Sequence, residues 1–279
     1  KWAYMKTHGN PAWRALPSYH TVVVPRILSC LSQHSLKATF FLVGQDAALD
    51  KNRELFAAIA AAGHEIGNHS FHHDPWLHQY AREDMARELE MAEEHIEEAT
   101  GRRPLGFRGP GYSLSQTTVE ELNRRGYLYD ASTLPTFIGP LARAYFFMSS
   151  AFTREEAACR STIFGGLRDG FRRIAPYRWN VGEEGLIEIP VTTMPFVRVP
   201  IHFSYLLYLS LYSRAAAKAY FRTALTFCRF AGVEPSLLLH PLDFLGPETA
   251  DGVAFFPGMG LPLTHKLEMI GWALEELKT

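Results

Sequence analysis

Cysteine, net charge and long apolar runs are all scarce in this chain of 279 residues. The cysteines, Cys30, Cys159 and Cys228, are too few and too scattered for a disulfide framework or a zinc ribbon. Their odd number favours a reducing compartment, so we expect a cytoplasmic protein, with membrane association as the alternative. A net charge of -1 provides no electrostatic footprint for nucleic acid.

Two further absences concern particular segments. The longest apolar run without formal charge, residues 199–213, is shorter than the roughly 20 residues that a membrane-spanning helix needs. The first residues show no apolar segment typical of a signal peptide. No Asp or Glu occurs before Asp46, so the beginning of the chain offers no carboxylate side chain.

The chain does contain a regular alternation of apolar runs and amphipathic segments. Strands are predicted at 37–44, directly before the histidines at 69–73, and at 106–108, 127–129, 186–191 and 236–240. Helices are predicted at 19–33, 52–62, 83–100, 115–125 and about 264–277. This rhythm is typical of an α/β fold with parallel strands and right-handed crossovers. Functional residues are then expected at the carboxyl ends of the strands.

The most informative segment is His69-Ser70-Phe71-His72-His73, which follows the lead-in 63–68. Two imidazoles at i and i+4 lie on one face of a helix or tight turn. Neutral imidazole is the commonest protein ligand for zinc and related ions. We therefore interpret His69 and His73 as candidate metal ligands. The alternative is a pair of surface histidines in a histidine-rich turn.

Three more polar residues follow predicted strands in the same way. Arg108 follows 106–107, Asp130 follows 127–129, and His240 ends the run 237–239. Each has a structural alternative: Arg108 as a capping or surface cation, Asp130 as a cap before Ser132, and His240 as a core histidine. Their recurrence in strand order nevertheless predicts a common site.

These segments together resemble the polysaccharide deacetylase family of the NodB-homology type. The matching pieces are Ala38-Thr39-Phe40-Phe41, residues 63–73, Phe107-Arg108-Gly109-Pro110-Gly111-Tyr112 and Leu237-Leu238-Leu239-His240. The histidine segment and its glycine-containing lead-in are the most specific part. The Leu-His pair is useful only through its order.

The resemblance implies a distorted (β/α) barrel, a single domain over 1–279, with a divalent metal held by an Asp and two His. The metal is expected to be Zn, with Co, Mn or Ni as alternatives because such ligands suit several ions. The implied roles cover ligands, catalytic groups and substrate contacts. They are His69 and His73 as metal ligands, Arg108 orienting the catalytic base, Pro110, Gly111 and Tyr112 shaping the substrate groove, Leu239 lining the acyl pocket, and His240 as general acid. Trp76 and Asp130 are predicted to contact the substrate, although Trp76 suits packing equally well.

The chain departs from the family at its first motif. The resemblance implies two acidic residues upstream of the 38–41 segment, one as base and one as third ligand, yet residues 1–45 contain none. Either these acids lie upstream of Lys1, or the chain is an inactive member. We favour the first explanation, because no strand is apparent before the helix predicted at 19–33.

A second departure is the arginine- and aromatic-rich region at about 137–230, which we interpret as an insertion. Its candidate apolar surfaces are 146–148 and 205–209. Packing on the barrel is the simpler interpretation. The functional alternative is a peripheral contact with a membrane or a lipid tail.

The predicted function is a metal-dependent hydrolase that removes an N-acetyl or N-formyl group from an amino sugar. The substrate is expected to be a polysaccharide or a lipid-linked glycan. The alternatives are hydrolysis of a small cyclic or linear amide, and a catalytically inactive carbohydrate- or lipid-binding relative.

Overall fold

The fold is described from a computed structural model, in which residues 14–15, 18–139, 166–183, 185–247 and 258–279 are defined. The chain divides into two compact units, 38–200 and a unit formed by 1–37 with 201–279. Each unit is described by itself. The predicted apolar segment 146–148 lies outside the described residues.

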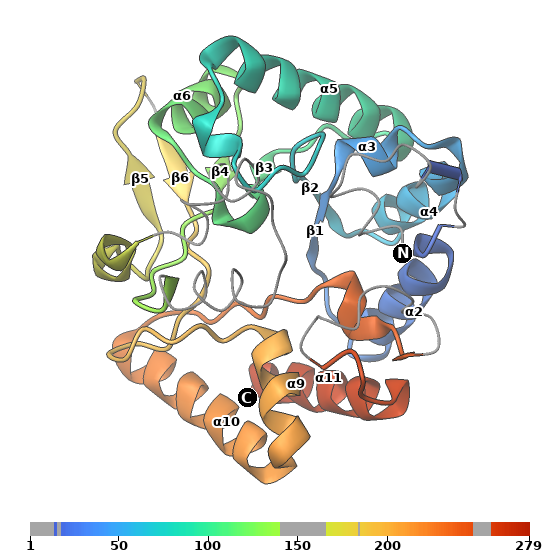
Figure 1. The fold of residues 1–279 in the computed structure, drawn as a ribbon, viewed down its shortest axis with the longest axis vertical. Helices are drawn as coiled ribbons and strands as arrows, with labels where there is room; N and C mark the ends of the chain where they lie inside the picture. The colour runs from blue at the N-terminus through green and yellow to red at the C-terminus, as the bar shows by residue number, and fades with distance from the viewer. Residues whose placement is uncertain (1–13, 16–17, 140–165, 184, 248–257) are drawn as a thin grey trace, which may run out of the picture. The chain divides into compact units, whose positions relative to one another are not determined.

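A six-stranded sheet forms the centre of the 38–200 unit (Figure 1). Its strand order is β1-β2-β3-β4-β6-β5, and all neighbours are parallel except the β5–β6 hairpin. The strands are β1 Thr39–Leu42, β2 Glu65–Asn68, β3 Gly106–Phe107, β4 Tyr129–Asp130, β5 Tyr177–Trp179 and β6 Leu186–Glu188. The prediction of an α/β fold with parallel strands is confirmed.

Helices connect β1 to β2, β2 to β3 and β3 to β4. They are α3 Gly44–Ala47, α4 Asp50–Ala61, α5 Arg82–Thr100 and α6 Gln116–Arg124, with short 3-10 turns η2 Leu77–Gln79, η3 Pro110–Tyr112 and η4 Leu167–Phe171. Helix α5 packs on β2, α3 and α4, and α6 packs on α5 and β6. The predicted helices 52–62, 83–100 and 115–125 are confirmed within two residues at each end. Ser115 caps α6 as expected, accepting from the Thr118 backbone N–H at 3.1 Å.

The core of this unit lies between α5, α6 and the sheet. The apolar stripe of α5 supplies Met85 and Leu89, which are fully buried against Phe107 of β3. The stripe recurs every three or four residues, so one face of the helix covers the sheet. Gly101 ends α5 with φ 68°, a left-handed conformation that favours glycine.

Helices dominate the other unit, formed by 1–37 and 201–279. They are α2 His20–Gln33, α9 Phe203–Tyr212, α10 Arg214–Ala231 and α11 Leu263–Lys278, with the 3-10 turn η5 Pro241–Phe244. The predicted helices 19–33 and 264–277 correspond to α2 and α11. None of the described helices is both long enough and apolar enough to cross a membrane.

The strand predicted at 236–240 is wrong, because these residues have no strand assignment. Leu238 accepts a hydrogen bond from the Phe203 N–H at 3.1 Å, at the start of α9. An apolar run becomes a strand only when a second strand pairs with it along its length. The 205–209 segment lies in α9, where Leu206 and Leu207 are buried and Tyr205 and Tyr208 are exposed.

Candidate active site

His69 stands directly after β2, at the edge where the parallel strands of the sheet end. Its N–H continues the ladder by donating to the Leu42 carbonyl at 2.8 Å. Its ring Nδ1 lies 2.5 Å from the Arg108 carbonyl oxygen, which only accepts, so Nδ1 carries the proton. The lone pair is therefore on Nε2, the arrangement that metal-binding histidines have when a backbone carbonyl holds the other nitrogen.

A tight turn brings His73 back to His69. Ser70 and His73 both have left-handed backbones, with φ 62° and 64°. Asn68 and Ser70 close the turn, since Asn68 Oδ1 accepts from the Ser70 N–H at 2.8 Å and Ser70 Oγ from the His73 N–H at 3.0 Å. The two ring centroids are 4.8 Å apart. The structure thus brings the predicted ligand pair together in a turn.

The donor set fits part of a metal site. Two adjacent imidazoles, one with its tautomer set by a carbonyl, suit a divalent first-row ion. Within the described residues, no group of three or more His, Cys, Asp or Glu is arranged to hold a metal ion. His69 and His73 would therefore provide two ligands.

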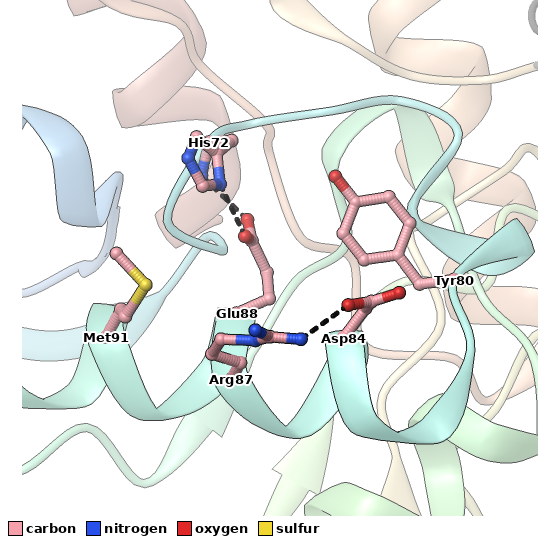
Figure 2. A pocket seen from close by; sticks show the side chains of 6 residues that line it. All are labelled: His72, Tyr80, Asp84, Arg87, Glu88 and Met91. Atoms are coloured by element: carbon pink, nitrogen blue, oxygen red, sulfur yellow. Dashed lines mark hydrogen bonds and ion pairs between the residues drawn. The ribbon is translucent and has the colours of Figure 1, made fainter.

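Glu88 of α5 anchors the histidine turn from the opposite side (Figure 2). It is 3% exposed. Oε1 accepts from the N–H groups of Phe71 and His72 at 2.9 and 2.7 Å, and Oε2 lies 2.6 Å from His72 Nδ1. Burial acts to raise the pKa of Glu88, but the hydrogen bonds from His72 outweigh it and hold the pKa below its ordinary value. His72 consequently points to α5, whereas His73 joins His69.

A pocket of about 350 Å³ opens beside this contact. Figure 2 shows its lining from α5 and the preceding loop, with the Arg87–Asp84 ion pair next to Glu88. Tyr80, His72 and Met91 complete the lining. The pocket lies on the His72 side of the turn and contains neither predicted metal ligand.

Arg108 is held rigidly at the end of β3. Its Nε donates to the Ala131 carbonyl at 2.9 Å, and its guanidinium carbon lies 4.5 Å from the centroid of the Phe41 ring. Burial lowers the pKa of the Arg108 guanidinium. Electrostatic interactions with the Tyr112 hydroxyl and the Asp130 carboxyl act to raise it. The structural alternative of a capping cation does not apply, because Arg108 follows a strand.

Two buried acids stand at the ends of β4 and β6. Asp130 accepts from Ser132 Oγ and N–H at 2.5 and 3.2 Å, and Glu188 accepts from Thr133 N–H and Trp179 Nε1 at 2.9 and 2.8 Å. Both acids are fully buried. Burial raises the pKa of Asp130 well above its ordinary value, and the neighbouring Glu188 carboxyl raises it further. The hydrogen bonds of Asp130 with Ser132 resemble those of the cap that was the structural alternative for Asp130. Its contact with a substrate stays a prediction.

The acid pair also supports the segment predicted to shape the substrate groove. Ser132 Oγ accepts from the Gly109 N–H at 2.7 Å while donating to Asp130. Gly109 directly precedes η3, in which Gly111 and Tyr112 have φ 58° and 63°. A left-handed residue other than glycine is strained, so the Tyr112 conformation is maintained by its surroundings. The groove role of Pro110–Tyr112 stays a prediction.

Trp76 lies on a loop that packs against this segment. A Cβ atom at Gly111 would lie 3.0 Å from the Pro75 side chain. Tyr80 closes the loop by donating to Asp74 Oδ2 at 2.7 Å. Trp76 is partly buried between these contacts, and its stacking on a sugar ring stays a prediction.

Leu239 and His240 belong to the unit of residues 1–37 and 201–279, so their predicted convergence with His69 stays a prediction. His240 Nδ1 is 4.0 Å from Asp243 Oδ2 and 3.5 Å from Ser204 Oγ, and its N–H donates to Asp243 at 2.7 Å. Burial raises the pKa of Asp243 to about 6, although the His240 N–H and the charge of Lys266 act to lower it.

The sequence interpretation missed Glu88, Glu188 and Asp243. A signal existed for two of them. Glu88 follows Met85 by three residues and therefore falls on the apolar stripe of α5. Glu188 lies two residues after Leu186 in the same strand, so the two side chains lie on the same, buried face.

Comparisons with known proteins point to one family. Residues 15–129 match the family model described as polysaccharide deacetylase. A peptidoglycan deacetylase from Helicobacter pylori is 31% identical over 113 residues, covering 40% of this chain and 38% of that protein. A peptidoglycan-N-acetylglucosamine deacetylase from Bacillus cereus is 37% identical over 104 residues, 37% of either protein. The chain thus spans well under half the length of these relatives.

A likeness in structure extends further along the chain. A crystal structure from Mycobacterium smegmatis, described as a candidate polysaccharide deacetylase, covers 98% of this chain and 79% of its own, with a TM-score of 0.59 and 20% identity. At this identity the likeness shows the fold alone, and it agrees with the fold class predicted from the sequence.

Proposed function

Because residues 15–129 belong to the polysaccharide deacetylase family, we propose that the protein is a metal-dependent hydrolase of N-acylated amino sugars. The observation that carries this proposal is the His69–His73 pair, with ring centroids 4.8 Å apart and the His69 Nδ1 proton directed at the Arg108 carbonyl. The relatives named as peptidoglycan deacetylases support an N-acetylated glycan as substrate. Removal of acetyl or formyl, from a polymer or a lipid-linked glycan, is part of the proposal.

The chemistry follows from the difficulty of amide hydrolysis. A divalent ion held by His69 and His73 would polarise the amide carbonyl and lower the pKa of a bound water. The Arg108 carbonyl accepts the Nδ1 proton of His69, which places the lone pair on Nε2, and Glu88 binds His72. Arg108 itself carries a fixed positive charge that would favour the ionised form of a neighbouring carboxylate base.

His240 is proposed as the general acid. An amine is too basic to leave as an anion, so a proton must reach the nitrogen as the C–N bond breaks. Asp243, 4.0 Å from His240 Nδ1, would orient the ring and favour its protonated form whenever Asp243 is ionised. Residues 1–45 provide no carboxylate for the catalytic base.

The test distinguishes His73 from His72 as the second metal ligand beside His69. Purified wild-type protein should contain about one equivalent of a divalent metal and release acetate from N-acetylglucosamine oligomers or peptidoglycan. His73→Ala should lose both properties. His72→Ala, altered at the adjacent position, should keep its metal, since His72 contacts Glu88. Equal metal contents in wild type and His73→Ala would refute the ligand assignment.

The second candidate is a catalytically inactive carbohydrate- or lipid-binding relative. It is favoured by one observation, that the described residues contain no group of three metal-binding side chains. Retained glycan binding with no metal after reconstitution would establish it. Turnover of small cyclic amides without turnover of glycans would instead indicate the small-amide hydrolase.

A further inference from the structure

An exposed apolar patch lies on two loops of the 38–200 unit, away from the histidine turn in sequence. It consists of Leu167, Phe171, Phe196 and Val197, which are 62%, 80%, 72% and 52% exposed. Scattered exposed apolar residues are normal, but contiguous ones mark interaction surfaces. The arrangement of the two loops decides which case applies.

Hydrogen bonds hold these loops side by side. Arg198 Nη1 donates to the Arg172 carbonyl at 2.9 Å, which joins the loop after Phe196 and Val197 to the end of η4. On the η4 side, the Phe171 ring packs edge-on against Phe137, with centroids 5.0 Å apart. The two segments that carry the four apolar side chains are therefore neighbours.

The turn that carries Phe196 has a closed base. The Met194 N–H donates to the Val199 carbonyl at 2.7 Å and the Arg198 N–H to the Met194 carbonyl at 2.8 Å. Phe196 and Arg198 have φ 72° and 58°. A phenylalanine with positive φ is strained, and the Phe196 side chain is nevertheless largely exposed.

Positive charge surrounds the patch. Residues 167–173 and 195–198 contain four arginines and one acid, Asp169. Asp169 pairs with Arg172 at 2.7 Å. Arg168 and Arg173 are exposed, and neither has an ion pair with another residue that the structure describes. The described part of the chain thus presents phenylalanine, leucine and valine side chains beside two arginines, Arg168 and Arg173, that have no ion pair within it.

This combination suits the interface of a bilayer that carries anionic lipid. Apolar side chains enter the boundary between headgroups and acyl chains, and each nearby arginine adds attraction to negative headgroups. A glycan suits the patch less well, because half of its apolar side chains, Leu167 and Val197, are aliphatic and have no ring face that could stack on a sugar. We propose that Leu167, Phe171, Phe196 and Val197, with Arg168 and Arg173, rest on an anionic membrane surface. The proposal goes beyond the deacetylase function and is measured without it.

The experiment is sedimentation of the whole chain with vesicles of phosphatidylcholine alone or mixed with phosphatidylglycerol. Wild type should bind the mixed vesicles more strongly, and salt should weaken binding. Phe196→Asn should lower the affinity about tenfold, the effect of withdrawing one phenylalanine from an apolar environment. Asparagine tolerates positive φ, so this variant should fold at least as well as wild type, which thermal unfolding checks.

The matched control is Phe230→Ser on α10, because Phe230 is 80% exposed, similar to Phe196 at 72%. It should bind vesicles as wild type does. Arg168→Gln with Arg173→Gln should weaken binding to the mixed vesicles only. The proposal is overturned if wild type ignores phosphatidylglycerol vesicles, or if Phe196→Asn binds them unchanged. It is equally overturned if Phe230→Ser loses as much affinity, or if Phe196→Asn abolishes a dimer that wild type forms without vesicles.

Discussion

Replacing Glu88 is the most direct way to test how α5 controls the histidine turn. In Glu88→Ala, the N–H groups of Phe71 and His72 lose their acceptor in a site where Glu88 is 3% exposed. Each buried donor left unsatisfied costs about 1–3 kcal/mol, so the free energy of unfolding should fall by about 4 kcal/mol. Glu88→Gln keeps one acceptor oxygen but loses the charge, and should cost about 1–2 kcal/mol.

The assay is urea-induced unfolding followed by circular dichroism, together with metal competition against a chromogenic chelator. Because the turn also sets the approach of His73 to His69, Glu88→Ala should weaken metal affinity about 10–100-fold, as is typical when a supporting group is lost. Glu94→Ala is the control, since Glu94 lies on the same helix but is exposed. It should change the unfolding free energy by less than about 0.5 kcal/mol. If Glu88→Ala behaves like Glu94→Ala in both assays, the anchoring role is refuted.

Two further predictions concern stability. The pKa of Asp243 is about 6 in the folded protein and 3.8 as the ordinary value, so its ionisation should lower the stability of the wild type by about 3 kcal/mol as pH rises from 4 to 6, with little change above. Asp243→Asn lacks this ionisation, so the stability of the wild type minus that of the variant should fall by the same amount over that range. Gly111→Ala should cost about 1–3 kcal/mol, because φ is 58° and the new Cβ meets Pro75 at 3.0 Å. Gly101→Ala, with φ 68° and open space, should cost less in the same urea titration, and an equal cost would show that the contact with Pro75 is unimportant.

Much of the secondary structure follows from local patterns. The apolar stripe of α5 and the capping serine of α6 act over three or four residues, and both predicted helices occur within two residues of their expected bounds. The strand predicted at 236–240 failed for the opposite reason. A strand requires a second strand as its partner, and Leu238 instead accepts a hydrogen bond from the Phe203 N–H at the start of α9.

The candidate site likewise has features that the sequence predicted and features that it did not. The spacing of His69 and His73 predicted their approach, because both lie within one turn of chain. The residues that hold this turn were not predicted, since Glu88 reaches it from the next helix and the Arg108 carbonyl from the next strand. The Asp130–Glu188 pair likewise depends on the parallel pairing of β4 with β6.

The sequence by itself determined the helices predicted at 52–62, 83–100 and 115–125, the α/β class and the pairing of His69 with His73, because each depends on neighbours a few residues apart. Tertiary structure alone decided that His72 contacts α5. The reason is that a buried carboxylate on α5 binds His72 and two backbone N–H groups, and so selects one conformation of the turn. It also decided that the segments carrying Phe171 and Phe196 are neighbours, since a hydrogen bond between Arg198 and Arg172 joins parts of the chain more than twenty residues apart.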